Sequence, residues 1–557
     1  MWLIDTQTYQ LKLCDNERYA ILSHTWGDEE VSFHDIQDLA RARKNQGFKK
    51  IEEACRIAQQ HGLTYCWVDT CCIDKSSSSE LSEAINSMFR WYREAVVCIA
   101  YLSDLGSTIT CSNLDIGVSL SRCRWFTRGW TLQELIAPRR VLFYDAMWTF
   151  FGEKKDLIQP LHDVTKIAIS VLQDAEHLPR IPVRVRMSWA AHRQTKRVED
   201  IAYSLMGIFN IFMPLMYGEG HRAFIRLQEE IIKDNHDLSI FAWAGDPEGQ
   251  KYVGLLAKSP SQFTTGVETL LFYKLKFTTD FSITNRGIQF HSMVTFDKGS
   301  GFYVLPLDCG IRVQEDNDNN LPRTIGIYLM RAPEFGLVRV LPDLIHTFKP
   351  WTSVAISRHQ RKRLYAPKTL APWQSDSIDS QEYLAIRLGN IGPGYIVDAC
   401  GPEDRWTPCS NTFITLGGTR FTAYCRLRFT TAKTGKFDCL LVCGLMRASS
   451  KDKNSLPSHD ETIHLKAWCS IFSSSSPMWK KLCEAVKGQD MEDLIYLRNI
   501  IDKKFGKSDV DSCVHESTKE TMLIDASSHK EDSESRFRID IGIQVRRRKS
   551  TQTEQSL

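Results

Sequence analysis

The stretch RGWTLQEL at residues 128–135 is the most informative part of the sequence about the fold. It brings an indole, Trp130, and a carboxylate, Glu134, to the opening of a short helical run that Pro138 ends. A strand-like run follows directly at residues 141–145. The stretch therefore predicts a polar and aromatic loop with a short helix at the end of a sheet.

Two earlier tracts have the same form: YAILSHTWG at residues 19–27 and WVDTCCIDK at residues 67–75. Each joins an apolar strand to a loop of polar and aromatic residues. Because parallel strands joined by helices place such loops at the carboxyl edge of the sheet, where open α/β sheets bind ligands, we expect one shared site. Its predicted members are Glu134 as the reactive group, with Ser23, His24, Trp26, Asp69, Arg128 and Trp130 around it.

These three tracts, in this order, resemble the hallmark segments of the heterokaryon-incompatibility (HET) domain of filamentous fungi. The resemblance covers roughly residues 1–235, because EDIAYSLMGIF at 199–209 and YGEG at 217–220 are similar to the family's usual continuation. One departure is Lys75, where glutamine is common in the family. The resemblance implies an effector of non-self recognition that promotes cell death after incompatible fungal cells fuse, acting with an incompatibility partner protein that the sequence does not identify.

The hydrophobic pattern predicts an α/β fold over residues 1–150. Strand-like runs lie at 19–23, 65–69, 95–102 and 141–145, and helical apolar stripes lie between them at 48–58 and 81–92. The serine run at 76–79 is suited to cap the second helix. We therefore expect an open, mainly parallel sheet flanked by helices, followed by a helical extension of the same region at 151–245.

Beyond residue 245 the hydrophobic pattern becomes that of short strands separated by turns. This predicts a separate β-rich domain of unknown role over 246–505. The expected strands lie at 281–284, 288–296, 302–305, 324–329, 384–388, 421–429 and 440–443. Residues 506–557 are rich in Ser, Lys, Glu and Asp, which predicts a disordered tail. The basic run RRRK at 546–549 is either a nuclear address or a solvated end.

Composition limits the classes of partner and compartment. A formal charge of +3 over 557 residues provides no strong field for nucleic acid, and we expect no nucleic-acid partner. The uncharged run at 201–217 is shorter than the ~20 residues that span a bilayer, so no membrane span is predicted. The first residues lack the features of a secretory signal, which favours an intracellular, cytoplasmic protein. The 17 cysteines are scattered without a regular framework, which favours reduced thiols. We expect no zinc site at Cys66, Cys71 and Cys72.

The strand and helix spacing, with a Trp-x-x-x-Glu pattern at Trp130 and Glu134, also resembles the Toll/interleukin-receptor (TIR) fold. This second resemblance implies a TIR-like, flavodoxin-like sheet and a glutamate that cleaves the nicotinamide–ribose bond of NAD, with NAD as substrate and no cofactor or metal. By analogy, Trp26 or Trp130 stacks on a flat ring and Arg128 meets a phosphate. Ser23, His24 and Asp69 hydrogen-bond ribose or amide groups by the same analogy.

Other interpretations of the same residues stay open. Thr131 and Glu134 fit a capping box, in which each side chain bonds the backbone of the other residue. The tryptophans fit core positions, and Asp69 fits a turn cap. At the level of function, the alternative to catalysis is a signalling module that acts by self-association as a homo-oligomer. A nucleotide-binding metabolic enzyme is disfavoured, because only Gly27 follows the first strand where a phosphate loop needs several glycines.

Overall fold

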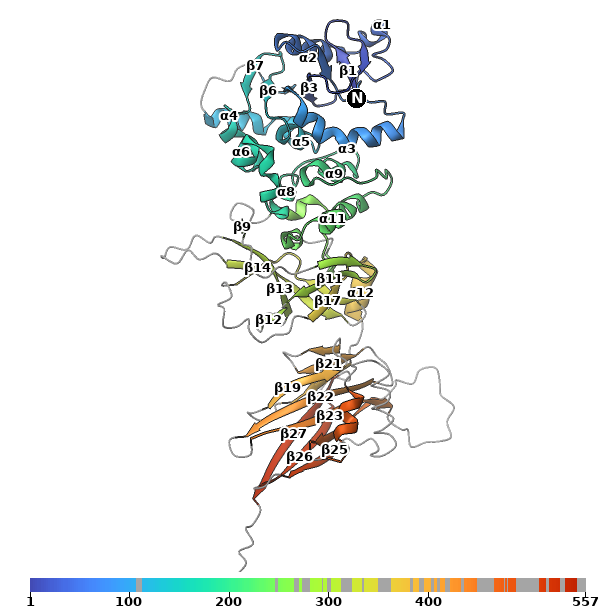
Figure 1. Ribbon diagram of the computed structural model, residues 1–557, viewed down its shortest axis with the longest axis vertical. Coiled ribbons are helices and arrows are strands. Elements are labelled where there is room, and N and C mark those ends of the chain that lie inside the picture. The colour runs from blue at the N-terminus through green and yellow to red at the C-terminus, as the bar shows by residue number, and fades with distance from the viewer. Residues whose placement is uncertain are drawn as a thin grey trace, which may run out of the picture. The chain divides into compact units, whose positions relative to one another are not determined.

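The computed structural model describes most of the first 245 residues and selected segments after them (Figure 1). The described residues are 1–106, 113–245, 249–264, 270–272, 281–292, 294–297, 302–311, 323–332, 335–348, 362–380, 384–389, 395–401, 405–407, 411–415, 421–431, 435–447, 465–474, 476–477, 479–486, 510–516, 520–530 and 536–547. They fall into two compact units, 1–330 with 337–371, and 331–336 with 372–557. None of the helices in these ranges has the length and apolar character needed to cross a bilayer.

A seven-stranded mixed sheet forms the centre of the N-terminal region. Its strands are β1 (Trp2–Asp5), β2 (Leu11–Leu13), β3 (Tyr19–His24), β4 (Tyr65–Trp67), β5 (Val97–Tyr101), β6 (Val141–Tyr144) and β7 (Phe150–Glu153), in the order β2-β1-β4-β3-β5-β6-β7. The four central strands, β4, β3, β5 and β6, are parallel, as predicted. The expectation of a mainly parallel sheet is too simple, because β1, β2 and β7 add antiparallel pairings at both edges.

Two of the helices between the parallel strands, at 48–60 and 78–94, follow the predicted apolar stripes, and the others were not predicted from a stripe. In chain order, the helices are α1 (Leu39–Ala42), α2 (Phe48–Gln60), α3 (Ser78–Glu94), α4 (Asn113–Ser121), η1 (Arg124–Thr127) and α5 (Thr131–Ile136). The buried face of α2 includes Phe48, Ile51 and Cys55. Ser77 caps α3 by accepting a hydrogen bond from the Glu80 amide at 3.3 Å, so the serine run has the predicted capping role.

Residues 151–245 are largely helical, as expected. The elements are α6 (Ile158–Thr165), α7 (Ile169–Gln173), η2 (Ala175–Arg180), α8 (Val183–Ser188), α9 (Asp200–Tyr203), α10 (Met206–Phe209), α11 (Arg222–Asp234) and η3 (Leu238–Phe241). The Glu199 carboxylate accepts hydrogen bonds from the amides of Gly218 and Gly220 at 2.8 and 3.0 Å. Both glycines have positive φ, so the turn at 217–220 is tight, and the Glu199 carboxylate links it to the other stretch of family resemblance.

The first unit continues past residue 245 into β-strands. These are β8 (Tyr252–Val253), β9 (Leu270–Phe272), β10 (Phe281–Thr284), β11 (Gly287–Ser292), β12 (Thr295–Asp297), β13 (Phe302–Ile311), β14 (Arg323–Ala332), β15 (Gly336–Val340), β16 (His346–Phe348) and β17 (Lys362–Ala366), with the 3-10 turn η4 (Pro260–Phe263). They build a three-stranded sheet and a seven-stranded sheet. The single strand expected at 288–296 is divided into β11 and β12. Buried side chains of these strands belong to the same hydrophobic core as the N-terminal sheet and helices.

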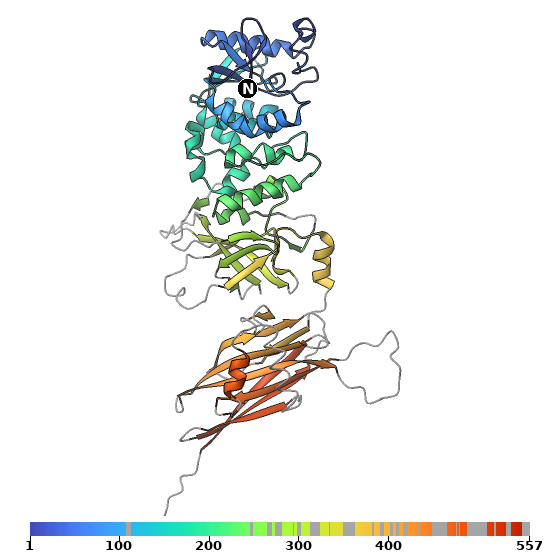
Figure 2. The ribbon, with the colours of Figure 1, turned by 45° about the vertical axis from the view of Figure 1, so that its right-hand side comes forward.

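The second unit contains two further sheets. Helix α12 (Pro372–Ser380) precedes β18 (Leu384–Leu388), β19 (Tyr395–Gly401), β20 (Trp406–Thr407), β21 (Thr412–Thr415), β22 (Phe421–Thr431), β23 (Gly435–Arg447), β24 (Leu465–Ser473), β25 (Val510–Glu516), β26 (Glu520–Lys530) and β27 (Arg536–Arg547). Six of the strands form one sheet and four form the other. Helix α13 (Trp479–Ala485) lies against the four-stranded sheet, packed on Trp468 and Phe472 (Figure 2).

The expectation of a disordered tail from residue 506 differs from the structure, since β25, β26 and β27 lie within 510–547. In β27, alternate residues Phe537, Ile539 and Ile541 are buried, and the charged residues between them hide this pattern in a composition-based reading. Part of the basic run, 546–547, lies at the end of β27, and residues 548–557 lie outside the described residues.

Candidate functional site

The first tract, at residues 19–27, and the third, at residues 128–135, meet at a buried hydrogen bond. The Ser23 hydroxyl, at the carboxyl end of β3, donates to Oε2 of Glu134 in α5. Ser23 Oγ in turn accepts from Trp125 Nε1 at 2.8 Å. Ser23 is fully buried and Glu134 is 5% exposed, so a chain of three side chains links the sheet edge to the short helix inside the protein. Ser23 and Glu134 are both members of the predicted site, and the structure brings them into contact.

The capping-box interpretation of Glu134 is wrong. Helix α5 begins at Thr131 with Trp130 as its N-cap residue, and no side chain caps it. The Thr131 hydroxyl donates instead to the carbonyl oxygens of Trp125 and Arg128. Because the carboxylate of Glu134 bonds Ser23 rather than the helix backbone, helix capping does not account for a glutamate here.

The electrostatic environment of Glu134 is that of a desolvated acid. Burial raises the pKa of Glu134 from its ordinary 4.5 to about 7, against the opposing hydrogen bond from Ser23. The charge of Asp69 also raises the pKa, and Arg128 and the Tyr92 hydroxyl lower it. A buried acid that titrates near neutrality beside a specific hydroxyl partner is characteristic of functional sites.

The first and second tracts meet in a second cluster. Trp26 Nε1 donates to Oδ2 of Asp69 at 2.9 Å. His24 is buried, with its Nδ1 4.0 Å from Asp69 Oδ1 and its Nε2 3.7 Å from Glu30 Oε2. Glu30 also bonds Lys50 of α2 and the Gly27 amide. Burial alone raises the pKa of Glu30, but its His24, Gly27 and Lys50 partners outweigh burial and hold the pKa at about 2.

Cations surround the ring of Trp26. The Lys75 ammonium lies 3.9 Å from the ring centroid, and the Lys196 ammonium and the Arg128 guanidinium lie 5.8 and 5.9 Å away. A cavity of about 160 Å³ borders Trp26, Glu30 and Lys75. The lysine that departs from the family's usual glutamine therefore makes the shortest of these three cation–ring contacts, and Glu134 does not line this cavity.

Trp130 points to a different partner. Its indole hydrogen-bonds Asp200 of α9, whose pKa is raised mainly by burial and lowered by this bond and by the Tyr217 hydroxyl. The neighbouring Gly129 donates its amide to the Gln194 carbonyl at 2.8 Å. A Cβ at Gly129 would approach the Thr195 methyl to 2.6 Å, so only glycine lets the loop at 193–197 pack here. Trp130 is thus tied to the helical extension, as is Arg128, whose backbone pairs with Gln194.

Several residues of the site were not predicted. Trp125 and Tyr92 contact the Ser23–Glu134 pair, and Arg193 donates to the Thr131 hydroxyl at 3.0 Å and to the Arg128 carbonyl at 2.8 Å. Lys50 and Glu30 anchor the loop after β3. Tyr92 and Trp125 look like ordinary core aromatics in the sequence, and Arg193 belongs to a polar loop with no periodic signal, so only the folded chain brings them together. Among the described residues, no group of three or more His, Cys, Asp or Glu side chains is placed to hold a metal ion.

Comparison with known proteins identifies related sequences. Residues 19–116 match the family described as heterokaryon incompatibility protein (HET), and residues 222–299 match a domain of unknown function, DUF8212. The chain is 48% identical over 222 residues to vegetative incompatibility protein HET-E-1 of Podospora anserina. That stretch is 39% of this chain and only 16% of the relative's length. No solved structure matches the chain.

Proposed function

We propose that this chain, whose residues 19–116 match the HET family, is an incompatibility effector that promotes cell death by cleaving NAD at Glu134. The observation that carries the chemistry is the Ser23–Glu134 pair, a carboxyl with a pKa of about 7 at the carboxyl edge of parallel strands. The order of those strands also supports a TIR-like, flavodoxin-like interpretation. Along the sheet, the parallel strands follow as second, first, third and fourth in the chain, which is the flavodoxin-like order.

The proposed reaction breaks the bond between the nicotinamide nitrogen and the ribose carbon. Nicotinamide leaves as a neutral molecule with the electron pair of that bond, and positive charge develops on the ribose ring. An ionised Glu134 stabilises this charge, and water then attacks the ribose carbon and loses a proton. The Trp26 ring and the cations beside it, Lys75, Arg128 and Lys196, supply an aromatic face and positive charge suited to the rest of a dinucleotide.

The proposal requires the site to open. With Glu134 5% exposed, the carboxyl reaches a ribose only after the Ser23 contact or the covering loops move. In this proposal an incompatibility partner triggers clustering of HET domains into a homo-oligomer, and the clustering exposes the Glu134 carboxyl. The cytoplasm, where NAD is present, is then the site of action.

The burial of Glu134 also favours a second function, non-catalytic signalling by self-association. In that case the Ser23–Glu134 bond is a structural link between β3 and α5, and toxicity does not depend on a negative charge. The two functions differ in what they require of the same carboxyl, so one substitution separates them.

The test is Glu134→Gln in the full chain, with Glu153→Gln as a matched control on β7. We expect the wild type to release nicotinamide from NAD when the protein is clustered, and Glu134→Gln to lose about 100-fold or more of that rate. Because the ionised form is the active one, the wild-type rate should rise with pH through about 7. The measurements are nicotinamide release by clustered protein and survival of cells that express each variant.

The control protein should keep both activity and toxicity, because Glu153 pairs with Arg140 and Lys155 outside the site. Full toxicity of a folded Glu134→Gln variant would reject catalysis and leave self-association. Absence of NAD cleavage by the clustered wild type, with toxicity intact, would have the same meaning.

A further inference from the structure

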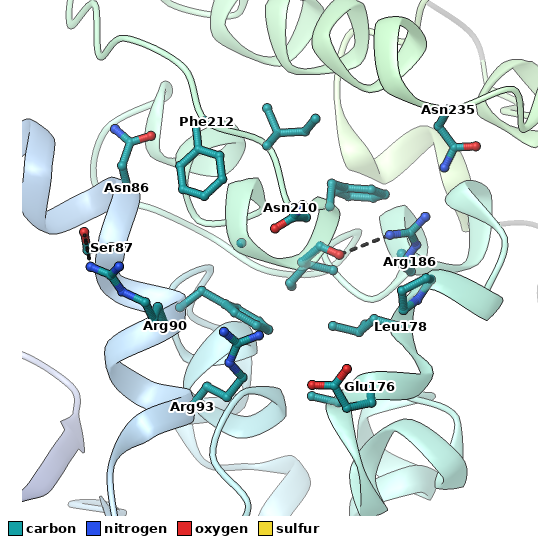
Figure 3. A pocket seen from close by; sticks show the side chains of 17 residues that line it. Asn86, Ser87, Arg90, Arg93, Glu176, Leu178, Arg186, Asn210, Phe212 and Asn235 are labelled. Atoms are coloured by element: carbon teal, nitrogen blue, oxygen red, sulfur yellow. Dashed lines mark hydrogen bonds between the residues drawn. The ribbon is translucent and has the colours of Figure 1, made fainter. Parts of the chain in front are cut away.

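A cavity of about 490 Å³ lies in the first unit, between α3 and the helical extension (Figure 3). Residues of α3, η2, α8, α10 and the segment after α10 line it. None of the predicted site residues lies in its lining, and no family resemblance assigns it a role. Its volume is in the range of small-molecule sites, which is about 300–1,000 Å³.

The walls of the cavity are positively charged. Figure 3 shows Arg90 and Arg93 of α3 on one side and Arg186 of α8 on the opposite side. Among the described residues that line it, Glu176 is the one with an acidic side chain. Three guanidinium groups facing one carboxylate leave an excess of two positive charges around the space, which favours an anionic occupant.

Arg186 is built into the wall rather than placed on the surface. It is 4% exposed, and its Nη1 donates to the Ile208 carbonyl at 3.1 Å. Its guanidinium also lies 4.5 Å from the ring centroid of Phe209, while Nε has no hydrogen-bond acceptor among the described residues. Burial lowers the pKa of Arg186 to about 10, so the group stays charged at neutral pH. A buried guanidinium with an unused donor is costly, and its positive charge favours an anion in the adjoining cavity.

The cavity also has an aromatic and apolar side. Phe212 is 69% exposed, which is unusual for a large apolar side chain, and Phe89, Phe209 and Leu178 add further apolar surface. Gly207 makes the floor close-packed, because a Cβ there would approach the Phe89 side chain to 2.2 Å. An occupant therefore meets guanidinium groups and aromatic rings at once.

We propose that this cavity binds a nucleoside phosphate, with the phosphate between Arg90, Arg93 and Arg186 and the base against Phe212. Arginine forks match phosphate oxygens in two-point hydrogen bonds, and the phenyl ring offers a face to the base. The cavity is separate from the Glu134 carboxyl, which does not line it. Helix α3 contributes to both places, through Tyr92 at Glu134 and through Arg90 and Arg93 at the cavity.

The test measures binding to the full chain by calorimetry with four probes: ADP, adenosine, ribose 5-phosphate and inorganic phosphate. We expect ADP to bind in the micromolar to low millimolar range, and each of the three partial probes to bind about tenfold more weakly or worse. Added salt should weaken ADP binding, because the phosphate contacts are ionic. Inorganic phosphate binding as tightly as ADP would overturn the nucleoside part of the proposal.

Exposed wall residues supply the variants, because substitutions at exposed positions usually change stability little. The double change Arg90→Ala with Arg93→Ala should weaken ADP about tenfold or more, and Phe212→Ala should weaken ADP while leaving inorganic phosphate unchanged. Arg56→Ala, on the exposed face of α2, is the control for loss of a surface arginine. Undetectable ADP binding at about 5 mM, or equal binding by the control and the wall variants, would show that the cavity is not a nucleoside phosphate site.

Discussion

At the scale of single residues, Glu134 is the position where sequence and structure constrain each other most. The sequence predicted both Ser23 and Glu134 as site members, and the structure joins them directly although 111 positions separate them. It also removes the competing explanation, since the Thr131 hydroxyl is committed to carbonyl oxygens and caps nothing. A linear pattern cannot show the burial that raises the pKa of Glu134, or the partners Ser23, Asp69, Tyr92 and Arg128 that adjust it, because folding alone brings these groups together.

This raised pKa makes stability depend on pH. The folded protein holds a proton on Glu134 more tightly than the unfolded chain, so the stabilising contribution is complete below about pH 4.5 and is lost as pH rises through about 7. Glu134→Gln keeps a neutral side chain at every pH. We therefore expect its free energy of unfolding to match the wild type near pH 5 and to exceed it by on the order of 2–3 kcal/mol near pH 8, measured by denaturant titration.

For the control, Glu153→Gln, we expect the opposite change in the free energy of unfolding. Although burial opposes the effect, the bonds of Glu153 to Arg140 and Lys155 hold the pKa of Glu153 below its ordinary value, so Glu153→Gln should lose stability above that range. A Glu134→Gln variant that is less stable than the wild type at pH 8 as well as at pH 5 would mean that the Glu134 carboxyl is ionised and well satisfied in the folded protein.

At the scale of elements, the sequence predicted helices and strands wherever apolar residues recur at regular spacing. It did not predict contacts between segments that are distant in the chain. The apolar stripes of α2 and α3 and the central strands β3 to β6 were all predicted from their spacing. The edge strands β1, β2 and β7 were missed; β2 and β7 are partly exposed and lack the continuous buried apolar run that marks a central strand such as β6. The loop at 193–197, which carries Arg193 to the site, has no pattern of its own.

That loop is held against the third tract by a glycine. Adding a methyl group at Gly129 brings it to 2.6 Å from the Thr195 methyl and 3.2 Å from the Ser204 hydroxyl, so the loop must move. We expect Gly129→Ala to cost about 1–3 kcal/mol in the free energy of unfolding, measured by thermal or denaturant melting. Movement of the loop also withdraws Arg193 from Thr131 and thereby loosens the start of α5.

A second glycine of the site provides the matched control. At Gly27 the nearest atom to an added Cβ is Glu30 Oε1 at 3.6 Å, an ordinary contact, so Gly27→Ala should change stability by no more than about 0.5 kcal/mol. Thr195→Ser removes the methyl group that clashes and keeps the hydroxyl that donates to the Arg197 carbonyl. Combining it with Gly129→Ala should restore part of the loss, and no rescue would place the strain elsewhere.

At the scale of the whole molecule, the predicted boundary near residue 245 divides a region that the structure keeps together. Residues on both sides of 245 belong to one compact unit that ends at 371. The match to a domain of unknown function at 222–299 crosses the same position. The change from helical to strand-like texture is real, but a change of secondary structure does not by itself separate hydrophobic cores, and sequence patterns carry no information on which faces share one.

The contacts across residue 245 are specific and buried. Gln228 of α11 exchanges two hydrogen bonds with the backbone of Ala257, at 2.8 and 3.0 Å. Arg339 of β15 is fully buried, donates to the carbonyl oxygens of Phe241 and Trp243, and lies 3.8 Å from the Trp243 ring centroid. Removing the strands leaves these polar groups and the surrounding apolar surface exposed to water.

A fragment of residues 1–371 should therefore fold cooperatively, whereas residues 1–235, the span of the family resemblance, should not. We expect the longer fragment to melt within about 5 °C of the first transition of the full chain, and the shorter one to aggregate or to melt more than about 10 °C lower, by calorimetry and size-exclusion chromatography. Within the longer fragment, Arg339→Met should cost about 2 kcal/mol or more, because it leaves the carbonyl oxygens of Phe241 and Trp243 without a donor. A stable fragment of residues 1–235 would show that the helical region does not need the strands after residue 245, and assays of NAD cleavage could then use that fragment. If the fragment is unstable, residues 1–371 are the smallest part of this protein in which the chemistry of Glu134 can be tested.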